Sequence, residues 1–206
     1  MKLLFCIFLY GISAWSQKVV TQTVGTSAFQ VVTSRDVKAS VILDQVLKNK
    51  APENYRELSS DEVNRVLFEF AIYRESQNLS AVKLNESDFK ALISDVENRL
   101  KNRQDWKALE ASQIELKNWL ERKRVAMTFF DLKVNSLIGI VTEDEIKDYF
   151  DKNRIKFGSS SFESQKNSIL LFLKKQNQKQ RIEDWVSALK SKYQVRNDLT
   201  PSTENP

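Results

Sequence analysis

The chain has 206 residues with no histidine and one cysteine, Cys6, and its 32 Lys and Arg against 27 Asp and Glu give a formal net charge of +5. The lack of histidine excludes His-based catalytic triads, histidine general bases and zinc sites with histidine ligands. Neither a Walker A loop nor a G-x-G-x-x-G motif occurs, so the sequence indicates no nucleotide cofactor.

Residues 1–16 have the pattern of a secretory signal peptide. Lys2 precedes an apolar run from Leu3 to Ile12, and Ala14-Trp15-Ser16 places small residues before a cleavage site at Gln17. The run is too short for a stable membrane span. We therefore expect export to the periplasm and a mature chain without cysteine, which excludes thiol catalysis. A buried N-terminal strand or an uncleaved anchor is the alternative interpretation.

Residues 18–33 are the only clear β region. They are rich in valine, and Gly25-Thr26-Ser27 has the composition of a turn, which predicts a β-hairpin. Thr33 is an expected N-cap, because Asp36 follows three residues later and can complete a capping box. The helix that it starts is expected to run to about Lys48.

The chain between Pro52 and Pro201 contains no proline and almost no glycine, which favours long helices. Acidic clusters in this region coincide with helix starts, so we interpret them as caps and not as acid–base pairs. The predicted helices run from Ser59 to about Ser76, from Asn85 through Leu100, over Gln104 to Ala111, from Ser112 towards Leu137, onward from Thr142, and from about Phe162 to Lys192. A short strand over Tyr193 to Arg196 is expected to pair with the hairpin, and residues 197–206 are expected to form a disordered tail.

Two helix-forming segments near the C-terminus, VTEDEIKDYFDKNRIKFG and FESQKNSILLFLKKQNQKQRIEDWVSALKSKYQVR, are separated by only three serines. They resemble the two flanks of the parvulin domain in SurA/PrsA-type periplasmic folding factors. The first carries the pattern I-T-x-x-E-[IV]-x-x-Y-[FY]-x-x-N-x-x-x-F at Val141, Thr142, Glu145, Ile146, Tyr149, Phe150, Asn153 and Phe157. The second fits the closing helix and strand at Phe162, Ile169, Leu173, Arg181, Trp185, Leu189 and Val195.

The resemblance covers most of residues 17–196, although the Asn-Gly turn usual in the family's hairpin is absent. It implies a mainly α, SurA N-terminal-domain-like fold with a small N-terminal hairpin. In the family a prolyl-isomerase domain usually lies between the two flanks, and here that domain is missing. The resemblance thus implies a chaperone that is not an enzyme.

The long helix predicted from Ser112 towards Leu137 has apolar residues on two sides, and some of them could form a binding surface. A helix that is apolar on two sides either packs in a core or lines a groove. A groove would be a candidate binding site, because exposed contiguous apolar patches mark interaction sites. The same question arises for the run from Ile169 to Leu173. The candidate client-binding residues are Trp119, Met127, Phe129, Phe130, Leu170 and Phe172. The neighbouring basic run Arg122-Lys123-Arg124 is interpreted as a solvated face, with contact to an anionic client or lipid as the alternative.

The expected function is that of an ATP-independent periplasmic chaperone for unfolded or partly folded outer-membrane and envelope proteins. No cofactor, metal, nucleic acid or small-molecule substrate is expected. The main alternative is a non-catalytic interaction module that binds one folded envelope partner. A prolyl isomerase with a non-standard site is a further alternative.

Overall fold

The computed structural model describes residues 22–28, 30–51 and 58–199. It is mainly helical, with a small three-stranded antiparallel sheet, and this confirms the predicted fold class. The elements are β1 (Thr23–Ser27), β2 (Gln30–Thr33), α1 (Ser34–Leu47), α2 (Ser60–Asn78), α3 (Glu86–Leu100), α4 (Gln104–Lys107), α5 (Gln113–Ser136), α6 (Glu143–Lys152), α7 (Arg154–Phe157), α8 (Phe162–Lys192) and β3 (Arg196–Asn197). The expected signal peptide and residues 200–206 of the expected tail lie outside the described residues. No helix in the described part of the chain is long and apolar enough to cross a membrane.

Helix starts lie where the sequence predicts them. Four helices begin with a complete capping box, in which the N-cap side chain and an acidic side chain three residues later satisfy each other's backbone amides. These N-caps are Thr33, Ser59, Ser112 and Thr142. Each cap contributes about 1 kcal/mol to its helix. Because caps act within one turn, their positions are readable from the sequence.

The turn of the hairpin is not at Gly25-Thr26-Ser27, where the sequence analysis placed it. Those residues belong to β1, and the chain reverses between Ser27 and Gln30, which are paired across the hairpin; Ala28 has a positive φ of 51°. Gly25 pairs with Asn197 of β3, and a Cβ atom at Gly25 would lie 2.3 Å from the Arg196 carbonyl oxygen. The glycine therefore serves the close approach of two strands and not a turn.

The expected C-terminal strand does pair with the hairpin, giving the strand order β2-β1-β3. The paired residues are Arg196 and Asn197, so the strand begins three residues later than predicted and shares only Arg196 with the predicted range. Tyr193 is instead the C-cap of α8, and Gln194 has a positive φ of 47°. The backbone amide of Asp198 also donates to the carbonyl of Val24 at 3.0 Å. The first residues after Arg196 are thus held by the sheet and do not begin a free tail.

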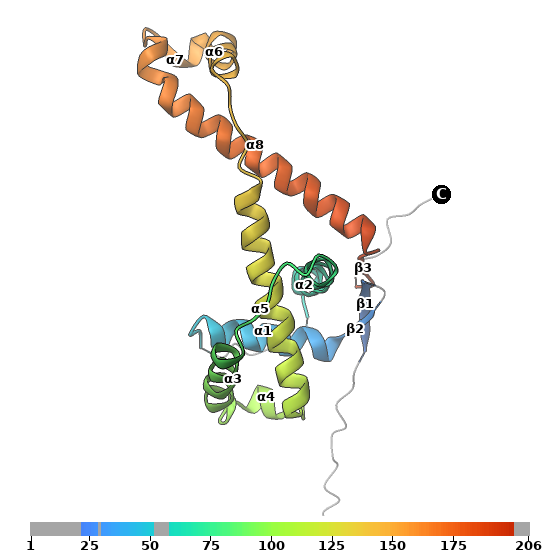
Figure 1. Cartoon of the computed structure of the whole chain (residues 1–206). Helices are drawn as coiled ribbons and strands as arrows, with labels where there is room; N and C mark the ends of the chain where they lie inside the picture. Colours follow the sequence, from blue (N-terminus) through green and yellow to red (C-terminus); the bar gives the residue numbers. More distant parts are fainter. Residues whose placement is uncertain (1–21, 29, 52–57, 200–206) are drawn as a thin grey trace, which may run out of the picture.

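The body of the molecule comprises the sheet, α1 to α5 and the C-terminal end of α8 (Figure 1). Three apolar clusters fill it, one under α1, α3, α4 and α5, one between the sheet, α1 and α2, and one where α2, α5 and α8 meet. In the third cluster Trp185 of α8 packs edge-on against Phe68 of α2 and Phe129 of α5, at ring distances of 6.2 and 6.4 Å. These contacts attach α8 to the body.

An arm extends from the body and consists of α6, α7 and the N-terminal part of α8 (Figure 1). It has its own small core, in which Ile146 and Phe150 of α6 pack against Ile169 of α8. The junction between the two family-like segments lies here. Phe157 and Phe162 both contact the Phe150 ring, at 5.1 and 5.5 Å, and only residues 158–161 connect them. The joined segments therefore close a compact tip.

Arg35 of α1 and Glu115 of α5 form an ion pair that ties these helices together. Hydrogen bonds from Arg35 and from the Ser112 backbone lower the pKa of Glu115 to about 2. Because this folded-state pKa lies below the ordinary value of 4.5, the stabilisation is present above pH 4.5 and is lost as pH falls towards 2. The pair is partly exposed, so we expect the loss to be about 1 kcal/mol or less.

Urea unfolding at neutral and at acid pH would measure this loss. Glu115→Gln keeps the capping box but should lose less stability than the wild type on acidification. Glu86→Gln, which removes an exposed i,i+4 pair with Lys90, is the control and should follow the wild type. Equal acid sensitivity in Glu115→Gln and the wild type would contradict the assignment.

Candidate functional site

The six candidate client-binding residues lie in different environments. Trp119 and Phe129 are buried in the body core, and the Trp119 indole donates a 2.9 Å hydrogen bond to Asp36. Leu170 is half-buried at the arm core, and Phe172 is 49% exposed beside Tyr149. Met127 and Phe130 line a hollow on the body. The structure brings only these last two together.

This hollow, the α2–α5 hollow, has a volume of about 340 Å³ and lies between α1, α2 and α5. Its apolar lining comprises Phe68, Ile72, Ala126, Met127 and Phe130. Met127 and Phe130 lie three residues apart on α5, so helical spacing places them on neighbouring parts of one face. The Met127 side chain is 46% exposed and has a flexible thioether, so it can adapt to apolar groups of different shape.

Charged side chains surround and underlie the apolar lining. They are Asp44, Lys48, Arg65, Glu69, Lys123 and Asp131. Lys123 Nζ lies 2.8 Å from both Asp44 Oδ1 and Glu69 Oε2 and donates to the Ser40 hydroxyl at 2.8 Å. The floor of the hollow is therefore a hydrogen-bonded network of charges between three helices.

Arg122 extends this network on the side of α2. Its Nε donates to Glu69 Oε1 at 2.9 Å, and its guanidinium lies 3.9 Å from the centre of the Phe70 ring. The interpretation of the basic run as a solvated face was therefore wrong for two of its three residues, because Arg122 and Lys123 are buried and only Arg124 is exposed. Acids on α1 and α2, far away in the sequence, supply the partners.

Glu69 is the centre of the network. Burial opposes its ionisation, but the charges of Lys123 and Arg122 and their hydrogen bonds outweigh burial and lower the pKa of Glu69. The carboxylate is thus held in its charged form, with both oxygens occupied. A carboxylate that is already paired with two cations is a poor general base, so this arrangement favours a structural role.

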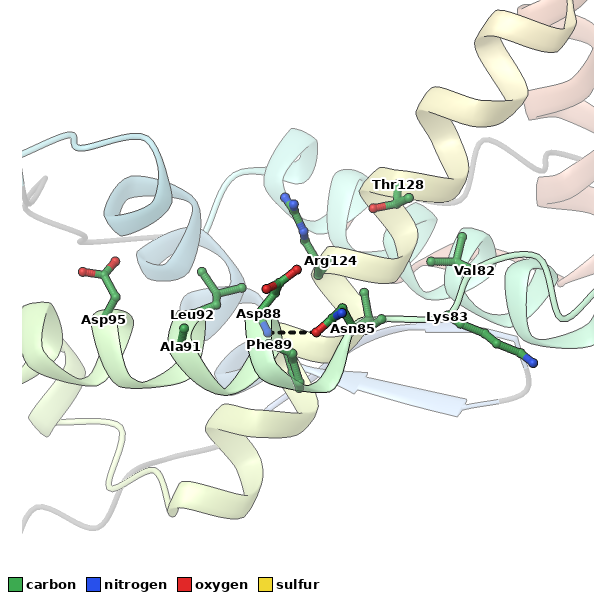
Figure 2. Close-up of a pocket in the computed structure, with 11 residues that line it drawn as sticks. Val82, Lys83, Asn85, Asp88, Phe89, Ala91, Leu92, Asp95, Arg124 and Thr128 are labelled. Atoms are coloured by element: carbon green, nitrogen blue, oxygen red, sulfur yellow. Dashed lines mark hydrogen bonds between the residues drawn. The ribbon is translucent and has the colours of Figure 1, made fainter.

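One further hollow adjoins the first, and a third adjoins that one. The second, of about 170 Å³, shares Asp44, Lys48, Lys123 and Met127 with the first. The third, of about 530 Å³, shares Leu92 and Arg124 with the second. Figure 2 shows this third hollow between α3 and α5, with Phe89 and Leu92 on α3 and Arg124 on α5. The three hollows together form a series around the exposed part of α5.

Metal-ligating side chains are not grouped around these hollows in the described part of the chain. No group of three or more His, Cys, Asp or Glu side chains in residues 22–28, 30–51 and 58–199 is placed to hold a metal ion. The charged groups that line the α2–α5 hollow are largely paired with one another. The arrangement offers an adaptable apolar surface on a rigid charged base, which suits binding.

One wall of the α2–α5 hollow could not be predicted from the sequence. Phe68 and Ile72 belong to α2, and no motif in the sequence indicated that they, Asp44 or Glu69 would line a hollow. Comparisons of the chain with protein-family models, with curated proteins and with solved structures found no match.

Proposed function

We propose that the chain is an ATP-independent periplasmic chaperone that holds unfolded outer-membrane or envelope proteins at the α2–α5 hollow, without prolyl isomerase activity. Unfolded barrel strands alternate apolar and polar residues. An apolar lining with a charged surround is complementary to such a segment. Release would follow from folding of the client, because no nucleotide motif occurs in the sequence.

The observation that carries this proposal is the position of Met127. It is a large apolar side chain, nearly half exposed, at the mouth of a hollow whose other apolar walls are Phe68, Ile72 and Phe130. Exposed apolar surface of this kind is retained where a partner covers it. Methionine and aromatic side chains also suit the plural binding that a chaperone needs.

The short connection at the arm tip supports the absence of isomerase activity. Gly158 to Ser161 join α7 to α8 directly, and Ser161 caps α8 by accepting from the Ser164 amide. In the family that the chain resembles, the isomerase domain usually lies at this junction. A proline-limited refolding assay is expected to show no acceleration by the protein.

The protein purified from the periplasm should suppress aggregation of an unfolded outer-membrane protein at near-stoichiometric ratios, measured by light scattering. Met127→Glu should weaken this suppression about tenfold, because a charge in the hollow removes about 1.5 kcal/mol of apolar contact. Leu132→Glu is the matched control, since Leu132 is an exposed residue of the same helix outside the hollow. It should suppress aggregation as the wild type does.

A wild-type protein that binds no unfolded client would overturn the proposal. In that case, recovery of one folded envelope protein in stable complex with the chain would support the interaction-module alternative. If Met127→Glu and Leu132→Glu were equally impaired, the client would not bind in the α2–α5 hollow.

A further inference from the structure

Within the arm, the basic residues are concentrated after α6, in α7 and the N-terminal part of α8. From Lys152 to Ile182 the chain has eight lysine or arginine residues and one acidic residue, Glu163, a net charge of +7. The whole chain has a net charge of only +5, and much of the offsetting negative charge is on α6 of the same arm, which carries Glu143, Asp144, Glu145, Asp148 and Asp151. The arm therefore carries a basic segment, α7 with the N-terminal part of α8, beside an acidic helix, α6.

Opposite charges occupy opposite faces of the arm. On α6 the residues Ile146 and Phe150 face α8 and are buried. Helical spacing places Asp144, Asp148 and Asp151 on the other side of α6, pointing away from α8. On α8 the buried Ile169 faces α6, and Lys174 and Lys175 lie on the far side by the same spacing. The acidic face of α6 therefore does not cover the basic face of α8.

Several arm cations have no acidic partner. Lys166 pairs with Glu143, and Lys179 lies 3.7 Å from Glu183. Within the described residues, no carboxylate lies at ion-pair distance from Lys156, Lys174 or Lys175. These three cations are available to an anionic surface.

Apolar side chains protrude among these cations. Ile155 of α7 is 99% exposed and lies between Arg154 and Lys156, at the end of the arm remote from the sheet (Figure 1). Leu171 of α8 is 69% exposed and lies one turn from Lys174 and Lys175. An uncovered isoleucine exposes apolar surface to water. Burial of Ile155 in the apolar interior of a partner would therefore be favourable.

We propose that the arm docks on an anionic phospholipid bilayer surface. Lysine and arginine side chains near such a surface each gain about 1 kcal/mol, and protruding apolar side chains enter the boundary between headgroups and acyl chains. A bilayer fits better than an acidic polypeptide, because a peptide needs hollows for its side chains and the three hollows described above lie on the body. Binding would be peripheral and reversible.

Co-sedimentation of the protein with vesicles tests this proposal. The protein should pellet with vesicles of phosphatidylglycerol and phosphatidylethanolamine, remain in solution with phosphatidylcholine vesicles, and be released by high salt. The variant Lys156→Gln/Lys174→Gln/Lys175→Gln should bind about 100-fold more weakly. The control Lys101→Gln/Lys107→Gln/Lys117→Gln removes the same charge from the body and should bind as the wild type.

Ile155→Ala tests the apolar contribution and should bind about tenfold more weakly. Ile114→Ala is its matched control, because Ile114 is 73% exposed at the start of α5, on the body, and should leave binding unchanged. Circular dichroism should show all variants folded, since each change is on an exposed or half-buried side chain.

Wild-type protein that ignores both vesicle types, or binds both equally, would overturn the proposal. Binding of poly-glutamate without vesicle binding would assign the arm to an acidic polypeptide instead and would equally overturn it. The arm variants should still suppress client aggregation, because their residues lie outside the α2–α5 hollow. A failure of vesicle binding can therefore be distinguished from a failure of the proposed chaperone function.

Discussion

Glu69→Gln is expected to destabilise the protein by about 3 to 5 kcal/mol, because it leaves two buried cations with one remaining acid. Lys123 would retain Asp44 and Ser40, but Arg122 would lose the carboxylate that its Nε binds. Arg122 Nη2 already lacks a hydrogen-bond partner. Urea unfolding, monitored by circular dichroism, measures the loss, and Glu86→Gln on the exposed face of α3 should change stability by less than about 0.5 kcal/mol.

A double variant separates the pair energy from the effect of losing one residue. Glu69→Gln/Lys123→Met should cost less than the sum of its single substitutions, with a coupling of about 0.5 to 3 kcal/mol. Additive costs would mean that Glu69 and Lys123 do not stabilise each other. A loss below about 1 kcal/mol in Glu69→Gln would show that the network is solvated and not buried.

The same substitution changes the response to acid. Glu69 has a pKa below its ordinary value of 4.5 in the folded protein, so its contribution is present above pH 4.5 and declines as pH falls further. Glu69→Gln cannot lose this contribution on acidification. The stability difference between Glu69→Gln and the wild type should therefore narrow below pH 4.5.

Phe150→Ala is expected to unfold the arm while the body stays folded. Phe150 is buried between Phe157 and Phe162, and replacing a core phenylalanine by alanine costs about 3 to 5 kcal/mol. The arm core has few other buried residues to compensate, namely Val141, Ile146 and Ile169. Because α8 is attached to the body through Trp185, the loss should remain local.

Hydrogen exchange would resolve this local unfolding. Amides of α6 and of the N-terminal part of α8 should exchange much faster in Phe150→Ala, whereas those of α2 and α5 should keep the protection of the wild type. Ile155→Ala is the control, because its side chain is exposed and its loss leaves no cavity. Uniformly faster exchange over the whole chain would mean that arm and body unfold together.

Helices and their starts could be predicted because the signals are local. A capping box such as Thr142 with Glu145 satisfies backbone groups within one turn, so no distant residue is needed to place it. The same holds for the long helix from Phe162 to Lys192, whose bounds agree with the prediction. The short α7 was not predicted, because four residues are too few for an apolar period to show.

The hairpin and the basic run show where local signals mislead. Gly25 lies in a segment with the composition of a turn, but a glycine is required there because β3, about 170 residues later in the chain, approaches it closely. Arg122 and Lys123 look solvated on α5, but α1 and α2 present acids to them. In both cases a partner far away in the sequence decides the environment.

The candidate site was predictable only in part for the same reason. From the sequence, α5 was predicted to be apolar on two sides, and residues on both sides were candidates. Met127 and Phe130 line the hollow, whereas Trp119 and Phe129 are buried in the core. Residues on two sides of one helix look alike until the neighbouring helices are placed.

The sequence by itself determined the helical class, the helix starts and the excluded chemistry, because composition, caps and periodicity act over a few residues. Tertiary structure alone decided which apolar residues remain uncovered and which charges are buried. It placed α2 beside α5 to form the hollow, and it separated the basic face of α8 from the acidic face of α6. Burial depends on what packs opposite a side chain, and that is set by the whole fold.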